Sequence, residues 1–143
     1  MLALVDALGP DLEYAYLVVQ DDEVSESKIR RPGRVYHVLR PRDKQHNFIR
    51  DAGKSLNSGF QSWKILRACK PDAVLSTGPS VAVPVCLLAR LSGVKVIFVE
   101  TGSRVTALSL TGKILYRVAD LFFVQWPDLA ARLPRAIYAG RLF

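Results

Sequence analysis

Five consecutive residues at the end of an apolar stretch have the chemistry of an anion-binding turn. Ser76, Thr77 and Gly78 end the stretch, Pro79 fixes a turn, and Ser80 stands where it would cap a following helix. Free N–H groups at a helix start attract phosphate and other anionic oxygens. The pattern indicates a phosphate-type site, but a serine that only caps and a glycine that only turns the chain would produce it too.

A second polar group follows the next apolar run. After "VIFV" the chain continues with Glu100, Thr101, Gly102, Ser103 and Arg104. The Glu100 carboxylate is suited to accepting hydrogen bonds from sugar hydroxyls or to acting as a base. Arg104 is suited to pairing with a phosphate, or simply with Glu100. A lone glutamate without a second positioned acid is weak support for catalysis, so a structural ion pair stays open.

The elements that must position these two groups alternate between strands and helices. We expect strands over 13–19, 34–40, 72–76, 94–99, 120–125 and 136–140, and helices over 47–68, 80–92 and 109–118. Runs of Val, Ile, Leu and Phe separated by helices are typical of a parallel sheet covered on both faces. We therefore predict one α/β, Rossmann-like, doubly wound domain over 1–143, with ligands outside the carboxyl ends of its strands.

The first residues do not fit the usual start of such a domain. "MLALVDALG" is typical of the end of an amphipathic helix, with Gly9 as its stop. A doubly wound domain normally begins with a strand and a glycine-rich turn before that helix. We therefore expect the chain to lack the first strand of its fold.

Composition favours a globular protein with an anionic partner. The chain has 143 residues, of which 50% are hydrophobic and 23% charged, and its net charge is +7. Cys69 and Cys86 lack metal-ligand spacing, and we expect them to be reduced, buried thiols, with no metal and no cofactor. Phe60 and Trp63 fall on the apolar stripe of the helix over 47–68 and are expected in the core.

A basic stretch over 28–44 carries seven Lys and Arg residues. Arg30, Arg31 and Arg34 are its candidates for contact with anionic headgroups, and an ordinary solvated face is the alternative. Nucleic acid is not favoured, because the aromatic residues expected of a single-strand platform are missing. The apolar stretch 79–89 is too short to span a bilayer, so membrane contact is expected to be peripheral.

The chain ends on apolar and aromatic residues. Tyr138, Arg141, Leu142 and Phe143 belong to types that interfaces favour, and no polar tail follows them. We expect these four residues to dock a partner subunit. The alternative is that Phe143 folds back onto the surface of this chain.

Residues 71–129, "PDAVLSTGPSVAVPVCLLARLSGVKVIFVETGSRVTALSLTGKILYRVADLFFVQWPDL", carry a family resemblance. Together with "AIYAGRL" at 136–142 they resemble the asparagine-linked glycosylation protein fourteen family and its bacterial polysaccharide-biosynthesis relatives. The likeness extends over about 20–143 and is strongest at Glu100–Val105, "LSLTGKILY", "ADLFFVQWP" and the end of the chain. A more distant likeness is to the peptidoglycan lipid-linked N-acetylglucosamine transferase.

The resemblance implies the acceptor-side half of a split GT-B glycosyltransferase. In the family, this half recruits a nucleotide-sugar-binding subunit to the cytosolic face of a membrane, and together they extend a lipid-linked sugar diphosphate. The family's first strand and its Gly-Gly-His-type loop would precede Met1. The membrane anchor of the eukaryotic members is not recognised in the sequence either.

Fitted to this role, Ser76–Ser80 and Glu100–Arg104 would line the acceptor side of a cleft whose other half comes from the partner. We therefore expect a peripheral glycosyltransferase subunit, active only with that partner, at the cytoplasmic face of a membrane. Two alternatives remain open: a stand-alone small-molecule enzyme with Glu100 as base, and a non-catalytic module that binds an anionic ligand.

Overall fold

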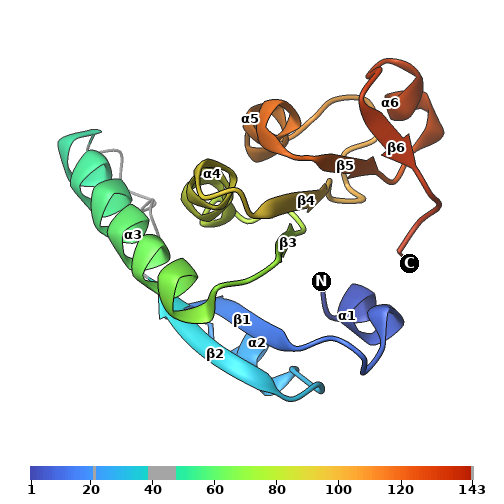
Figure 1. Ribbon diagram of the computed structural model, residues 1–143. Coiled ribbons are helices and arrows are strands. Elements are labelled where there is room, and N and C mark those ends of the chain that lie inside the picture. Colours follow the sequence, from blue (N-terminus) through green and yellow to red (C-terminus); the bar gives the residue numbers. More distant parts are fainter. Residues whose placement is uncertain (21, 39–47, 143) are drawn as a thin grey trace. The chain divides into compact units, whose positions relative to one another are not determined.

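The computed structural model describes residues 1–20, 22–38 and 48–142 (Figure 1). The chain divides into two compact units, Met1–Cys69 and Lys70–Phe143, and each is described by itself. The single domain expected over 1–143 stays a prediction.

The first unit contains a two-stranded parallel sheet. Its elements are α1 (Leu2–Leu8), β1 (Tyr14–Val19), α2 (Glu23–Ser27), β2 (Gly33–Val38) and α3 (Phe48–Cys69). Val5, Tyr16 and Val18 form its buried cluster. As expected, the first helix ends at Gly9, whose φ of 85° lies in the left-handed region that glycine adopts without strain.

The second unit is a four-stranded parallel sheet in the order β3-β4-β5-β6. Its elements are β3 (Ala73–Ser76), α4 (Ala82–Leu91), β4 (Lys95–Val99), α5 (Leu110–Val118), β5 (Leu121–Val124), α6 (Pro127–Ala131) and β6 (Ala136–Tyr138). Figure 1 shows α4 and α5 side by side along the sheet. The alternating elements and parallel strands confirm the Rossmann-like α/β fold.

Aromatic side chains fill the core between β4, β5 and α5. Phe98 and Phe122 are buried and stacked with their ring centroids 5.1 Å apart, and Tyr116 meets Phe122 edge-on at the same distance. Aromatic pairs at this separation stabilise a core by about 0.5–1.5 kcal/mol beyond the area they bury. This packing fixes β4 beside β5 and so sets where the two strands end.

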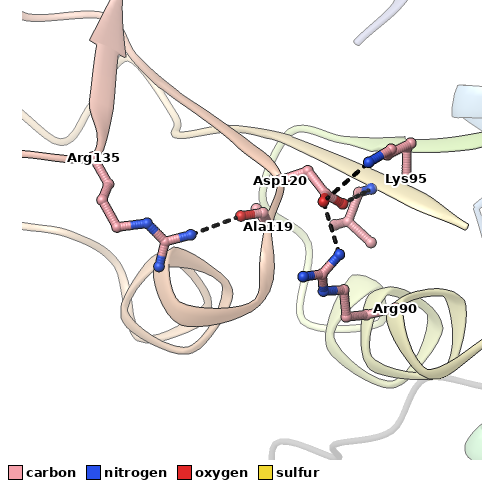
Figure 2. A network of polar contacts seen from close by, with 6 residues as sticks. Arg90, Lys95, Ala119, Asp120 and Arg135 are labelled. Atoms are coloured by element: carbon pink, nitrogen blue, oxygen red, sulfur yellow. Dashed lines mark hydrogen bonds and ion pairs between the residues drawn. The ribbon is translucent and has the colours of Figure 1, made fainter. Parts of the chain in front are cut away.

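A polar network ties the starts of the same strands together (Figure 2). The Asp120 carboxylate accepts hydrogen bonds from the backbone N–H of Val96 at 2.9 Å and from the Arg90 guanidinium at 2.8 Å, and Lys95 lies 3.7 Å away. The Val96 N–H and the two cations lower the pKa of Asp120 below its ordinary value of 3.8, against the opposing effect of burial. The network therefore holds the strand register at the edge opposite the carboxyl ends.

Two expectations about buried side chains are corrected. Phe60 and Trp63 are 53% and 40% exposed instead of buried. Their rings stack on each other, with Lys64 over the Phe60 ring and Arg67 over the Trp63 ring, so these neighbours on the same helix cover only part of the aromatic surface. The two thiols are free, but only one of them is fully buried, because Cys69 is half-buried. Burial raises the pKa of Cys86 to about 12.

Two short helices were not expected from the sequence. α2 has only five residues and no apolar stripe, and it begins where the Asp22 carboxylate accepts from the N–H and hydroxyl of Ser25. α6 also has five residues and begins at Pro127, a residue type favoured in the first helical turn.

Candidate functional site

Three buried polar side chains mark the carboxyl ends of three neighbouring strands. Ser76 ends β3, Glu100 follows β4 and Gln125 follows β5, and their exposed fractions are 4%, 1% and 5%. The register pairs Ser76 with Phe98 and Val99 with Phe123, so all three ends lie at one edge of the sheet. This is the edge at which ligands bind in open parallel α/β sheets. The structure therefore brings the two predicted groups together.

The first group, residues 76–80, is called the β3 loop. The buried Ser76 hydroxyl accepts from the backbone N–H of Gly78 at 3.4 Å. Gly78 has a φ of 113°, which a residue with a side chain rarely adopts, so glycine is required at this turn. Thr77 is half-buried, whereas Pro79 and Ser80 are exposed. The start of the loop is thus held by a buried hydrogen bond, whereas Pro79 and Ser80 are open to solvent.

The prediction that Ser80 caps the following helix is wrong. α4 begins at Ala82, and its N-cap residue, Val81, makes no side-chain capping bond. Instead, the carbonyls of Pro79 and Ser80 accept from the N–H groups of Ala82 and Val83 at 2.9 and 3.3 Å. The turn carries the chain into the helix through backbone bonds, so the Ser80 hydroxyl stays exposed and available to a ligand.

The Glu100 carboxylate is buried at the start of α5. One oxygen accepts from the N–H of Thr101 at 3.0 Å, and the other accepts from both the N–H and the hydroxyl of Ser109 at 3.1 Å each. Ser109 is the N-cap of α5 and in turn accepts from the N–H of Gly112 at 2.9 Å. A negative charge is stabilised at a helix start. Glu100 therefore anchors its loop to α5 with both oxygens.

The second group, residues 100–104, is called the β4 loop. Its Thr101 and Ser103 hydroxyls lie 3.3 Å apart, and Ser103 and Arg104 are exposed. The loop closes through a bond from the Arg104 N–H to the Thr101 carbonyl at 3.0 Å. In the described part of the chain, no ion pair joins the Arg104 guanidinium to Glu100. The loop thus offers two hydroxyls and a cation to a ligand.

Gln125 and Trp126, which follow β5, were missed by the sequence analysis. The Gln125 Nε2 donates to the carbonyl of Glu100 at 2.9 Å, and the Trp126 indole N–H donates to the carbonyl of Gly102 at 2.7 Å. The rule that selected Ser76 and Glu100, polar residues directly after a buried strand, would also have selected Gln125. Both residues hold the backbone of the β4 loop.

Residues 139–142, the C-terminal segment, contact the same two side chains. The Leu142 N–H donates to the Gln125 Oε1 at 3.2 Å, and the Arg141 guanidinium lies 3.8 Å from the centroid of the Trp126 ring. Tyr138, at the end of β6, is 44% exposed. Phe143 lies outside the described residues. Docking of a partner by these residues stays a prediction.

The predicted membrane-facing arginines differ in their surroundings. Arg30 and Arg34 are exposed. Arg31 is half-buried and its guanidinium donates to the Asp6 carbonyl at 3.1 Å, so it is partly engaged within the first unit. Residues 39–44 of the basic stretch lie outside the described residues. No helix within the described ranges is long and apolar enough to cross a membrane.

A surface hollow of about 460 Å³ lies on α5, and several of the side chains that line it are basic. Its lining consists of Leu108, Lys113, Ile114, Tyr116, Arg117 and Arg135, none of which was a predicted site residue. Arg135 is held in place by a bond to the Ala119 carbonyl at 3.1 Å (Figure 2). Across the described residues, no group of three or more His, Cys, Asp or Glu side chains could hold a metal ion.

Comparison with known proteins identifies relatives along nearly the whole chain. The family described as "Oligosaccharide biosynthesis protein Alg14 like" matches residues 1–142. The human "UDP-N-acetylglucosamine transferase subunit ALG14" is 33% identical over 148 residues, covering 89% of this chain and 68% of the human protein. The Schizosaccharomyces pombe protein of the same name is 48% identical over 75 residues, covering 49% of this chain and 36% of its own length.

Solved structures share the fold at low identity. MurG of Acinetobacter baumannii superimposes with a TM-score of 0.74 at 20% identity and covers 97% of this chain. The UDP-N-acetylglucosamine 2-epimerase of Rickettsia bellii gives a TM-score of 0.58 at 18% identity. The chain spans 39% of that MurG chain and 37% of the epimerase.

Proposed function

Because the chain belongs to the Alg14-like family of oligosaccharide biosynthesis proteins, we propose that it is one subunit of a two-component glycosyltransferase. The assembled enzyme transfers N-acetylglucosamine, or a similar sugar, from a nucleotide sugar to a lipid-linked sugar diphosphate. The observation that carries this proposal is the human relative, which matches 89% of this chain and is named a transferase subunit.

The two loops at the sheet edge supply the acceptor side of the reaction. Arg104, exposed and without an acidic partner in the described chain, pairs with a phosphate oxygen of the acceptor diphosphate. Thr101 and Ser103 hydrogen-bond to sugar hydroxyls or to the same phosphates. In the β3 loop, which follows the neighbouring strand, Ser80 adds an exposed hydroxyl.

Glu100 fits a positioning role within this site. Both of its oxygens accept hydrogen bonds from Thr101 and Ser109, and 1% of its surface is exposed. The general-base role predicted from the sequence requires the carboxylate to leave Ser109 and reach the acceptor hydroxyl. We therefore propose that Glu100 holds the β4 loop in the shape that presents Thr101, Ser103 and Arg104.

The remaining parts of the proposal concern the partner and the membrane. A nucleotide-sugar-binding subunit docks on Tyr138 and the C-terminal segment, where Tyr138 and Arg141 are exposed. Arg30 and Arg34, both exposed, contact anionic headgroups at the cytoplasmic face of a membrane, with Arg31 beside them. The subunit is thereby placed where the lipid-linked acceptor is found.

A mixing experiment tests the proposal. The purified chain, a candidate nucleotide-sugar-binding subunit and their mixture are each given radiolabelled UDP-N-acetylglucosamine and a lipid-linked N-acetylglucosamine diphosphate. Transfer is expected only in the mixture. Robust transfer by this chain alone would contradict the subunit assignment and favour a stand-alone enzyme.

Arginine variants assign the acceptor contact within that experiment. Arg104→Gln removes a charge-assisted bond of about 1.5–3 kcal/mol, so kcat/KM for the acceptor should fall roughly 10–150-fold. Arg132→Gln is the matched control, because Arg132 is also exposed but follows α6. Equal activity of the two variants would remove Arg104 from the site.

A further inference from the structure

Gln125 contacts the β4 loop with one end of its amide and the C-terminal segment with the other. Its Nε2 donates to the Glu100 carbonyl at 2.9 Å, and its Oε1 accepts from the Leu142 N–H at 3.2 Å. The reversed amide would face an oxygen with its oxygen and an N–H with its NH₂, losing both bonds. Because Gln125 is 5% exposed, water cannot readily replace these partners.

Trp126 makes a second connection between the same two segments. The edge of its indole donates to the Gly102 carbonyl at 2.7 Å, while its face carries the Arg141 guanidinium at 3.8 Å. A cation at this distance from a tryptophan face is attracted by the ring quadrupole. In the described part of the C-terminal segment, the polar contacts thus all go to Gln125 and Trp126.

We infer that Gln125 and Trp126 are positioning residues that couple docking at the C-terminal segment to the shape of the β4 loop. This rests on the proposed function, in which the partner subunit binds the C-terminal segment and the β4 loop binds the acceptor. Neither residue touches substrate in this scheme. They act through the backbone carbonyls of Glu100 and Gly102.

The balance of contacts gives the direction of the coupling. The β4 loop is also anchored by the Glu100 carboxylate and by a bond from the Glu100 N–H to the Phe123 carbonyl at 2.8 Å. The C-terminal segment has no comparable anchor among the described residues, and Arg141 is exposed. In the free subunit the segment therefore opens more readily than the loop. Docking of the partner keeps the C-terminal segment in contact with Gln125 and Trp126, and this stabilises the hydrogen bonds of these two residues to the β4 loop.

Hydrogen–deuterium exchange of the full chain tests the coupling without any partner. Deleting Arg141–Phe143 removes the segment's half of both connections. Exchange of peptides covering 100–105 should then speed up at least about threefold, because the exposed cation–π contact alone corresponds to that factor and the Leu142 bond to Gln125 is lost as well. A peptide covering β1 serves as the internal reference and should not change.

A double variant provides the decisive comparison. Gln125→Leu with Trp126→Phe cuts both bonds to the loop but keeps an aromatic ring for Arg141. In this background the deletion should change exchange at 100–105 by less than about 1.5-fold, since the connection is already broken. If the double variant folds poorly, Trp126→Phe alone should reduce the effect of the deletion. Trp63→Phe, at a 40% exposed indole in the first unit, is the matched control.

A second part of the exchange experiment adds the partner subunit. Its addition, at a concentration that saturates both proteins, should slow exchange at 100–105 in the wild type but not in the double variant. In the assembled enzyme, Trp126→Phe should raise KM for the acceptor or lower kcat, leaving KM for the nucleotide sugar unchanged. A purely structural defect would lower stability and partner binding together.

Two results would overturn the coupling: no effect of the deletion on 100–105, or an equal effect in the wild type and the double variant. The proposed function fails separately, if the candidate subunit neither binds nor yields transfer. In that event the deletion experiment still decides whether Gln125 and Trp126 connect the two segments.

Discussion

Replacing Glu100 by glutamine changes one oxygen of the buried carboxylate into an NH₂ group while keeping the length of the side chain. The carboxylate accepts three hydrogen bonds, one from the N–H of Thr101 and two from Ser109. An amide can accept at only one of its two terminal atoms. With its oxygen toward Ser109, it keeps both of those bonds and turns its NH₂ group against the Thr101 N–H.

The expected loss of stability follows from this geometry. A buried donor left without a partner costs about 1–3 kcal/mol. Loss of the negative charge at the start of α5 adds about 0.3–1 kcal/mol. We therefore expect Glu100→Gln to lower the free energy of unfolding by about 1.3–4 kcal/mol. For a domain of 60–100 residues, each kcal/mol lowers the melting temperature by roughly 4–8 °C.

Thermal unfolding at pH 7, followed by near-ultraviolet circular dichroism, measures this loss. Glu13→Gln is the matched control, because it makes the same chemical change at an exposed glutamate and should shift the melting temperature by less than about 2 °C. If Glu100→Gln melts like the control but abolishes transfer by the assembled enzyme, the anchoring role is refuted. The carboxylate would then be acting as the base predicted from the sequence.

Three further predictions address other parts of the chain. Gly112→Ala should lower the free energy of unfolding in urea by about 1–3 kcal/mol, because the added methyl group would overlap the buried Glu100 carboxylate. Gly59→Ala in α3 is the control, because the added methyl group there meets open space and should not destabilise. Folding lowers the pKa of Asp120, so the Asp120 carboxylate stabilises the folded protein fully above about pH 3.8, and this stabilisation is lost as the pH falls through the folded pKa. The difference in free energy of unfolding between the wild type and Asp120→Asn should therefore shrink as the pH is lowered over that range. Arg30→Gln with Arg34→Gln should weaken binding to anionic vesicles, and salt should weaken wild-type binding too; equal binding to neutral vesicles would leave only a solvated face.

The sheet and the two loops were predictable because their signals are local. Continuous apolar runs predicted β3, β4 and β5, and the parallel order then placed Ser76 and Glu100 at one edge. The burial of Glu100 was not predictable, because it depends on Ser109 and on the start of α5 folding over the carboxylate. Nothing next to Glu100 in the sequence distinguishes an exposed acid from an anchored one.

On the surface of α3, the sequence predicted burial that the structure does not show. The spacing of Phe60 and Trp63 predicted a buried stripe, yet both rings are exposed and stacked under Lys64 and Arg67. Periodicity identifies one face of a helix, but it does not say what covers that face. Gln125 was missed for a different reason: its position after a buried strand marks it as a candidate, but its role depends on Glu100 and Leu142, which lie far from it in the sequence.

The candidate site separates into a buried frame and an exposed working surface. Glu100, Gln125 and Trp126 hold the backbone of the β4 loop from α5 and from the end of β5. Ser103 and Arg104 project from that backbone into solvent. Substitutions in the frame should therefore lower stability and transfer together, whereas substitutions of the exposed residues should lower transfer alone. A variant such as Arg104→Gln, inactive at an unchanged melting temperature, would identify the groups that meet the acceptor.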